Sequence, residues 1–372
     1  MMIPMNELIA MPARKAGAND EISVSCLVNE IPAYVEPELD RIYEHHFSSL
    51  PFLRLYCDAG HDVNTYVVRR DGVAFVILLF RVNGGIAHVL NTMIRIEHAE
   101  VLRFARYVFE HFDTVWAINF RAVQSDVDNL PFPFQRHNSQ ERFPVALPAT
   151  PQEYTARLGR STREAIKRYR KKLLQDFPSF SCRFYVNEEI DEHDVNALID
   201  LSAARIALKK KRFGIDAADR KRIMHLARMR GFVCIIRING CICAGTINFR
   251  VGNAYFLEVI TNDQAYNDYR LGTICCYMTL CECIARGGTK YDFGGGWNHY
   301  KVKFLGVQQD MDCVEIYRSR MHLVQKSHRA AKTFVDGYVR QMKLWLLAHE
   351  KSLATRFMHQ VNMLVQSVVK RG

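Results

Sequence analysis

Apolar and polar residues alternate over short stretches in the first third of the chain. Residues 22–28 alternate in this way, and residues 66–70 and 73–82 flank the pair Asp71-Gly72. Because Asp and Gly accept the positive φ angles of a tight turn, these last two stretches are predicted to form a β-hairpin. The same pattern predicts further elements: strands over 86–93 and 115–120 and helices over 36–50 and 97–112.

A second run of apolar stretches lies in the later part of the chain. Residues 232–239, 241–250 and 254–261 are separated by Asn239-Gly240 and Gly252-Asn253, which predicts a three-stranded meander. A helix to about residue 286 and a short strand over 290–293 follow. The pattern therefore predicts two α/β (α+β) units. The stretch 126–139, which contains prolines, is predicted to be a linker between them, with the boundary near residue 150.

Length and composition are typical of a folded, soluble protein of about two domains. The chain has 372 residues, of which 49% are hydrophobic and 24% charged. Its longest apolar run, 73–80, falls far short of the ~20 residues that a membrane span needs, and the N-terminal residues do not resemble a secretory signal. The eleven cysteines include no C-x-x-C pair. We therefore expect free thiols, a cytoplasmic location, no transmembrane segment and no metal site.

The charge is unevenly distributed along the chain. Residues 1–150 carry 13 Lys and Arg against 18 Asp and Glu, whereas residues 151–372 carry 37 against 21, a net charge of +16. The most basic part is a predicted helix over 153–177, in which Arg163 and Lys167 belong to a cationic face. This face is either simply solvated or a groove for phosphates or RNA.

The last fifty residues have apolar positions near helical spacing. We expect one or two long helices over 320–369, with Lys and Arg between the apolar residues. The alternatives are packing against the body of the protein, peripheral contact with a membrane surface, and binding of a partner.

The stretch 266–306 carries the candidate chemistry. Arg270, Leu271, Gly272 and Thr273 open the helix that follows the meander. Thr273 is a candidate cap, and free backbone N–H groups in the first turn of a helix form a seat for an anion such as a diphosphate. After the strand over 290–293, a run of three glycines precedes a cluster of basic and aromatic residues: His299, Tyr300, Lys301 and Lys303.

This stretch resembles a known family. "YRLGT", a helix ending in "ARGG", and "YDFGGGWNHYKVKFLG" are similar to the signature of the GNAT-superfamily branch that contains the CelD-like acetyltransferases and the Fem-type aminoacyl transferases. The resemblance covers roughly residues 153–306. In the usual GNAT phosphate turn, (Q/R)-x-x-G-x-(G/A), only Gly272 has its counterpart here.

The resemblance implies two tandem GNAT-like domains with mixed sheets flanked by helices. These are a degenerate N-terminal domain (1–150), an acyltransferase domain (151–319) and a C-terminal helical extension (320–372). It implies N-acyl transfer from acetyl-CoA or another acyl-CoA, bound at residues 270–273, to the amine of a small molecule or amino sugar. The alternative is a Fem-like transferase with aminoacyl-tRNA as donor, which the basic helix favours. A third hypothesis is a non-catalytic binding module.

Roles can be assigned to the polar residues of the candidate site. Acyl transfer to an amine requires a held donor, a deprotonated amine and stabilisation of a tetrahedral intermediate. Glu258 on the last meander strand is the candidate base. Tyr300 is the candidate acid, and Asp292 orients the glycine loop or binds the substrate amine. Lys301 holds the acceptor or polarises the carbonyl; His299, Lys303, Arg163 and Lys167 are the further candidate substrate-binding residues.

Overall fold

The N-terminal half of the chain forms a meander with helices beside it. The computed structural model describes residues 21–60, 62–208 and 212–348. Strands β2, β3 and β4 are antiparallel neighbours, and β6 returns parallel to β4 after the crossover helix α3. The elements are β1 (Ile22–Leu27), α1 (Val35–Tyr43), η1 (His46–Ser48), α2 (Leu50–Tyr56), β2 (Asn64–Arg70), β3 (Val73–Asn83), β4 (Ile86–Val89), β5 (Arg95–Ile96), α3 (His98–His111) and β6 (Ala117–Ser125).

The C-terminal half repeats this order. Strands β9, β10 and β11 form a meander, and β12 returns parallel to β11 after α8. Two helices, α4 (Pro151–Arg157) and α5 (Arg160–Asp176), precede the repeat. Its elements are β8 (Ser181–Val186), η2 (Asn187–Glu189), α6 (Glu192–Leu208), α7 (Ala217–Arg230), β9 (Gly231–Ile238), β10 (Cys241–Val251), β11 (Ala254–Asn262), η3 (Gln264–Tyr269), α8 (Leu271–Ala285) and β12 (Lys290–Gly295).

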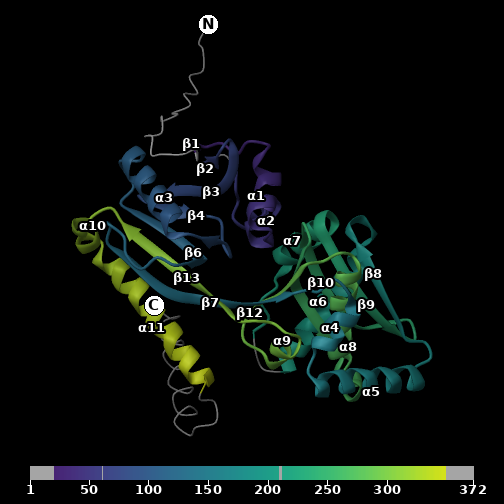
Figure 1. Cartoon of the computed structure of the whole chain (residues 1–372). Helices are drawn as coiled ribbons and strands as arrows, with labels where there is room; N and C mark the ends of the chain where they lie inside the picture. Colours follow the sequence, from purple (N-terminus) through teal and green to yellow (C-terminus); the bar gives the residue numbers. More distant parts are fainter. Residues whose placement is uncertain (1–20, 61, 209–211, 349–372) are drawn as a thin grey trace.

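The two halves exchange one strand each at the centre of the sheet. Strand β7 (Phe134–Ala146) follows β6 in the chain but pairs with β12 of the other half, and β13 (Gln309–Tyr317) follows β12 but pairs with β6. These two strands also pair with each other. The result is one continuous mixed sheet, in the order β1-β2-β3-β4-β6-β13-β7-β12-β11-β10-β9-β8, that runs through both halves (Figure 1).

This continuity corrects the sequence analysis in two respects. The predicted α/β fold is confirmed, but the sheets of the two halves are one sheet. The last six residues of the expected linker at 126–139 belong to β7, which begins at Phe134. This part of β7 carries polar residues at successive positions, with His137 opposite Cys313 of β13, so it lacks the apolar alternation by which a strand is predicted. The domain boundaries at 150 and 319 stay a prediction.

Helices cover both faces of the C-terminal part of the sheet. Apolar residues of α6 and α7 pack with Val233, Ile235 and Val259 on one face. On the other face, α8 packs with Cys234 and Ile236, and Leu173 of α5 joins this core. Helix α5 thus lies outside α8, at the edge of the C-terminal half (Figure 1).

Two further helices follow β13. They are α10 (Arg320–Gln325) and α11 (Ser327–Ala348), and the short α9 (His299–Lys303) lies between β12 and β13. Helix α11 runs along β7, where Arg340 donates a 3.1 Å hydrogen bond to Asn138. The expected helix beyond Ala348 lies outside the described residues. Within the described ranges, no helix is both long and apolar enough to cross a membrane.

Candidate active site

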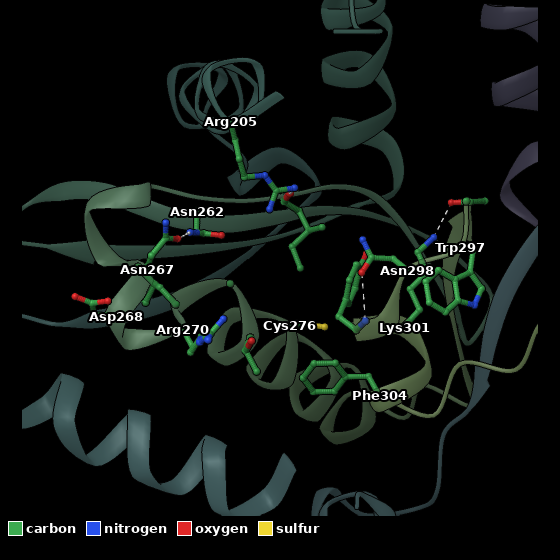
Figure 2. A pocket seen from close by; sticks show the side chains of 17 residues that line it. Arg205, Asn262, Asn267, Asp268, Arg270, Cys276, Trp297, Asn298, Lys301 and Phe304 are labelled. Atoms are coloured by element: carbon green, nitrogen blue, oxygen red, sulfur yellow. Dashed lines mark hydrogen bonds between the residues drawn. The ribbon is translucent and has the colours of Figure 1, made fainter. Parts of the chain in front are cut away.

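A cavity of about 820 Å³ opens where β11 and β12 separate. These parallel strands pair only from Ala254 to Phe256 and from Lys290 to Asp292. Beyond this point, β12 turns away through Gly294 at φ +68°. The gap is lined by the end of β11, the start of α8, the glycine loop after β12, and α9. Asn267, Asp268 and Arg270 lie on one side of it, and Trp297 and Lys301 on the other (Figure 2).

The first turn of α8 presents unused backbone donors to this cavity. The carbonyl of Arg270, which has a left-handed φ of +50°, accepts the N–H groups of Thr273 (2.9 Å) and Ile274 (3.2 Å). The N–H groups of Leu271 and Gly272 have no acceptor in the described part of the chain. All four predicted donor-binding residues, 270–273, line the cavity. The expected cap by Thr273 is wrong, because Arg270 is the N-cap residue and its side chain makes no capping bond.

Gly272 lies close to the side chain of Asn262. A Cβ atom at this position would lie 2.7 Å from Oδ1 of Asn262, at the end of β11. Contacts below about 3 Å are repulsive for carbon and oxygen. The missing side chain therefore keeps the start of α8 close to β11 and leaves the N–H of Gly272 accessible from the cavity.

Lys301 fixes the glycine loop. Its ammonium group donates hydrogen bonds to the carbonyl of Gly294 (3.0 Å) and to that of Gly295 (2.6 Å), and the residue is only 4% exposed. Burial lowers the pKa of Lys301 to about 8, and the nearby Asp292 partly opposes this shift. Because an ammonium has three N–H donors, one remains for a ligand in the cavity that Lys301 lines.

Asp292 also binds the glycine loop. Its Oδ1 accepts the N–H of Gly294 (2.8 Å), and its Oδ2 lies 3.4 Å from Nη1 of Arg142 and 3.8 Å from Nε2 of His45. Burial raises the pKa of Asp292, but His45, Arg142 and the Gly294 N–H together bring the pKa below its ordinary value. Asp292 is 3% exposed and does not line the main cavity. This geometry fits the predicted role of orienting the loop and not that of binding a substrate amine.

The other two candidate catalytic residues differ in position. Tyr300 lines the cavity and packs edge-on against Phe293, and burial raises its pKa, so its hydroxyl stays protonated. Glu258 occupies the β-bulge between the paired residues Leu257 and Val259 of β11 and lies outside the cavity lining. Burial, and then Asp219 of α7, raise the pKa of Glu258 to about 7. A role as direct base in this cavity is therefore not supported by its position.

The four predicted substrate-binding residues also lie outside the lining. Arg163 donates to the carbonyls of Ala156 (2.8 Å) and Leu158 (2.5 Å), where it satisfies the end of α4. Lys167 and Lys303 are exposed. His299 contacts the cavity indirectly, through an edge-on contact with Trp297 at 4.6 Å.

Sequence reasoning missed several lining residues, among them Arg205, Trp297 and Asn262. Arg205 reaches the cavity from α6, where it donates a 3.2 Å hydrogen bond to the carbonyl of Ile260, and its buried Nε has no partner among the described residues (Figure 2). Trp297 is 49% exposed at the rim, and Asn262 faces Gly272. Of these residues, only Trp297 could have been identified from the sequence, because it is an apolar residue inside a polar glycine loop. Arg205 comes from a helix that the hydrophobic pattern did not predict.

The basic helix α5 adjoins the mouth of the cavity. Near its end, Asp176 accepts a 2.8 Å hydrogen bond from the hydroxyl of Tyr269, and the ammonium of Lys172 lies 4.5 Å from the centre of the Tyr269 ring. Tyr269 belongs to η3, the segment that carries Asn267 and Asp268 of the lining. The exposed cations of α5 are Arg160, Lys167, Arg168, Arg170, Lys171 and Lys172.

Comparison with known proteins identifies the fold of this site. Residues 160–302 match the family described as acetyltransferase (GNAT) domain, whereas no curated protein matches the chain. The structure is similar to that of FemX, with a TM-score of 0.55 and 10% identity over 77% of this chain and 96% of that chain. L-PGS from Bacillus licheniformis gives a TM-score of 0.46 and 11% identity over 80% and 94% of the two chains. The expected resemblance is thus confirmed: residues 160–302 are a GNAT-type acetyltransferase domain, in a chain with the fold of FemX.

Proposed function

We propose that this protein is an acyltransferase that moves an aminoacyl group from aminoacyl-tRNA to the amine of a small molecule. The observation that carries this choice of donor is the exposed cationic face of α5 beside the cavity mouth. The fold similarity to FemX, which extends over both halves of the chain, agrees with the Fem-type resemblance of the sequence.

Electrostatics favour a long anionic donor over a small one. Six cations of α5 are exposed, and Glu164 and Asp176 are the exposed acids on that helix. A row of this kind follows a nucleic-acid backbone and gains affinity from the release of counterions. A diphosphate alone would need only the seat at Leu271 and Gly272 and would leave the row on α5 unused.

The cavity supplies groups for the donor's reactive end. Trp297 offers an exposed ring on which a terminal base stacks. In the proposed reaction, the acceptor nitrogen attacks the ester carbonyl, whose oxygen becomes negative and takes the third N–H of Lys301. The C–O bond to the ribose then breaks, Tyr300 donates a proton to the leaving oxygen, and the amine proton passes to solvent.

Acyl-CoA is the second candidate donor. The free N–H groups of Leu271 and Gly272 lie at the first turn of α8, where a helix favours a pyrophosphate. The same reaction geometry would then act on a thioester, with an amino sugar or another small amine as acceptor.

Salt-dependent binding distinguishes the two donors. We expect tRNA to bind tightly at low salt. In the double variant Lys167→Glu with Lys171→Glu, the slope of log K against log salt should become less steep by about one to two units. Lys221→Glu on α7 is the matched control, because it makes the same change at an exposed lysine outside the cavity lining. Equal tRNA affinity of all three proteins, together with a rise in melting temperature on adding acetyl-CoA, would favour acyl-CoA instead.

A membrane surface is the second partner that we propose. Helices α10 and α11 expose large apolar residues: Met321, Val324, Phe334, Val335, Tyr338, Val339 and Met342. Apolar residues on a helix in a basic region suit the headgroup layer of an anionic bilayer. Flotation with phosphatidylglycerol vesicles tests this, and binding that survives Phe334→Ser with Tyr338→Ser would contradict it.

A further inference from the structure

A second cavity, of about 410 Å³, lies outside the lining of the one described above. It is formed where β9 begins, where β10 turns into β11, and where α8 ends. Its volume falls within the range of about 300–1,000 Å³ that small-molecule sites occupy. Three arginines from three different elements line it: Arg230, Arg250 and Arg286.

One buried polar group in the wall of this cavity lacks a partner. The hydroxyl of Tyr255 makes no hydrogen bond to any described residue, although Tyr255 is only 1% exposed. Leaving a buried hydroxyl unpaired carries a free-energy cost. An acceptor supplied by a ligand would remove this cost.

Two of the arginines keep donors available for such a ligand. Arg250 donates hydrogen bonds from Nε to the carbonyl of Gly252 (2.7 Å) and from Nη2 to Oδ1 of Asn253 (3.4 Å). Because both acceptors are neutral, they do not compensate the positive charge of Arg250. Its guanidinium lies 5.7 Å from the centre of the Tyr255 ring. Arg286 pairs with Glu282 through Nε alone, and both of its Nη groups lack a partner among the described residues.

The third arginine is already occupied. Arg230 forms ion pairs with Asp40 (2.9 Å) and Glu36 (3.1 Å) of α1. It therefore connects α7 to the N-terminal half and forms a fixed wall of the cavity. Phe232 and the half-exposed Met229 add apolar surface beside these charges.

We propose that this cavity binds an organic phosphate, with the phosphate group between Arg250, Arg286 and the hydroxyl of Tyr255. Arginine guanidinium groups bind phosphate oxygens through several parallel N–H donors. The volume exceeds what a lone phosphate needs, and Phe232 and Met229 give the organic part an apolar contact.

Calorimetric titration with phenyl phosphate tests the proposal on the full chain. We expect binding by the wild type and none of phenol at the same concentration. Tyr255→Phe should weaken binding about tenfold, since it removes one hydrogen bond to a charged group, and Arg250→Gln or Arg286→Gln should weaken it at least as much. Arg228→Gln on α7 is the control, because Arg228 is an exposed arginine outside the cavity.

The melting temperature of the free protein gives an independent test. Because the hydroxyl of Tyr255 is unpaired without ligand, Tyr255→Phe should not lower the melting temperature of the free protein, so a loss of affinity in this variant is not a loss of fold. The proposal is overturned if the wild type does not bind phenyl phosphate. It is equally overturned if Tyr255→Phe and the two arginine variants bind it as the wild type does, since the ligand then lies elsewhere.

Discussion

Nε2 of His45 lies 3.8 Å from Oδ2 of Asp292, and both residues are buried. His45 precedes η1 in the N-terminal half, whereas Asp292 belongs to β12 and receives the N–H of the cavity loop at Gly294. The carboxylate of Asp292 thus links a side chain of the N-terminal half to the loop that shapes the cavity.

Removing this carboxylate should destabilise the whole protein. Asp292→Ala leaves the buried charge of Arg142 without its ion-pair partner and the Gly294 N–H without its acceptor. Breaking a buried ion pair from one side costs about 3–5 kcal/mol. Asp200→Ala is the matched control, because it breaks the 2.6 Å pair with Arg220 at a carboxylate that is 67% exposed, where the expected loss is below about 1 kcal/mol. Equal losses in urea unfolding would show that Asp292 has no special structural role.

Acid should destabilise the fold through His45, because burial disfavours its protonated form. Burial, opposed by Asp292, lowers the pKa of His45 from 6.5 to about 4. Between these values the unfolded chain binds the proton and the folded chain does not, so the free energy of unfolding falls as the pH drops from 6.5 towards 4. This loss amounts to about 3 kcal/mol.

The variant His45→Asn keeps an acceptor for the Phe47 N–H and removes this titration. Its free energy of unfolding should depend less steeply on pH in that window, by up to about 1.4 kcal/mol per pH unit. His46, whose pKa burial also lowers, is present in both proteins and cancels. Parallel pH profiles of the two proteins would show that His45 is protonated in the fold.

A side chain at Gly272 should displace Asn262, which donates hydrogen bonds to the carbonyl of Asp263 (3.1 Å) and to Oδ1 of Asn267 (3.3 Å). Alanine is favoured over glycine in a helix by about 1 kcal/mol, but its Cβ would lie 2.7 Å from Oδ1 of Asn262. We expect Gly272→Ala to lower the melting temperature and to weaken donor binding about tenfold. Asn262→Ala with Gly272→Ala should recover the melting temperature, whereas Asn262→Ala alone serves as control. A higher melting temperature in Gly272→Ala would mean that no such contact exists.

Activity should fall as the pH rises through about 8. The proposed role of Lys301 requires the ammonium form, and burial lowers its pKa to about 8. The measurement is the initial rate of aminoacyl transfer to hydroxylamine, an amine that is uncharged over this range, with the uncatalysed rate subtracted. Tyr300→Phe should reduce the rate at every pH but leave the midpoint unchanged. A rate that rises through pH 8 would instead indicate that the neutral amine of Lys301 acts as a base.

Local signals predicted the parts of the fold that depend on local geometry. The Asn239-Gly240 and Asp71-Gly72 pairs form hairpin turns with positive φ at both residues, as the sequence pattern requires. The start of α8 at Leu271 and the strand at Lys290 follow from the same kind of reasoning.

Long-range pairing could not be predicted in this way. The strand β13 and the length of β7 depend on partner strands in the opposite half of the chain. The residues of these two strands do not indicate this pairing. The position of Asp292 relative to the cavity could not be predicted for a related reason. Asp292 and Lys301 were grouped by their proximity in sequence, but the side chain of Asp292 points to His45 and Arg142, while Lys301 lines the cavity.

The most direct test of the proposed function is the release of a labelled acyl group from its donor. Labelled aminoacyl-tRNA and labelled acetyl-CoA are each incubated with hydroxylamine and either the wild type or Lys301→Met. We expect the wild type to accelerate release from aminoacyl-tRNA about a hundredfold over Lys301→Met and to leave acetyl-CoA unaffected. Acceleration with acetyl-CoA alone, or equal rates for both proteins on aminoacyl-tRNA, would contradict the proposal.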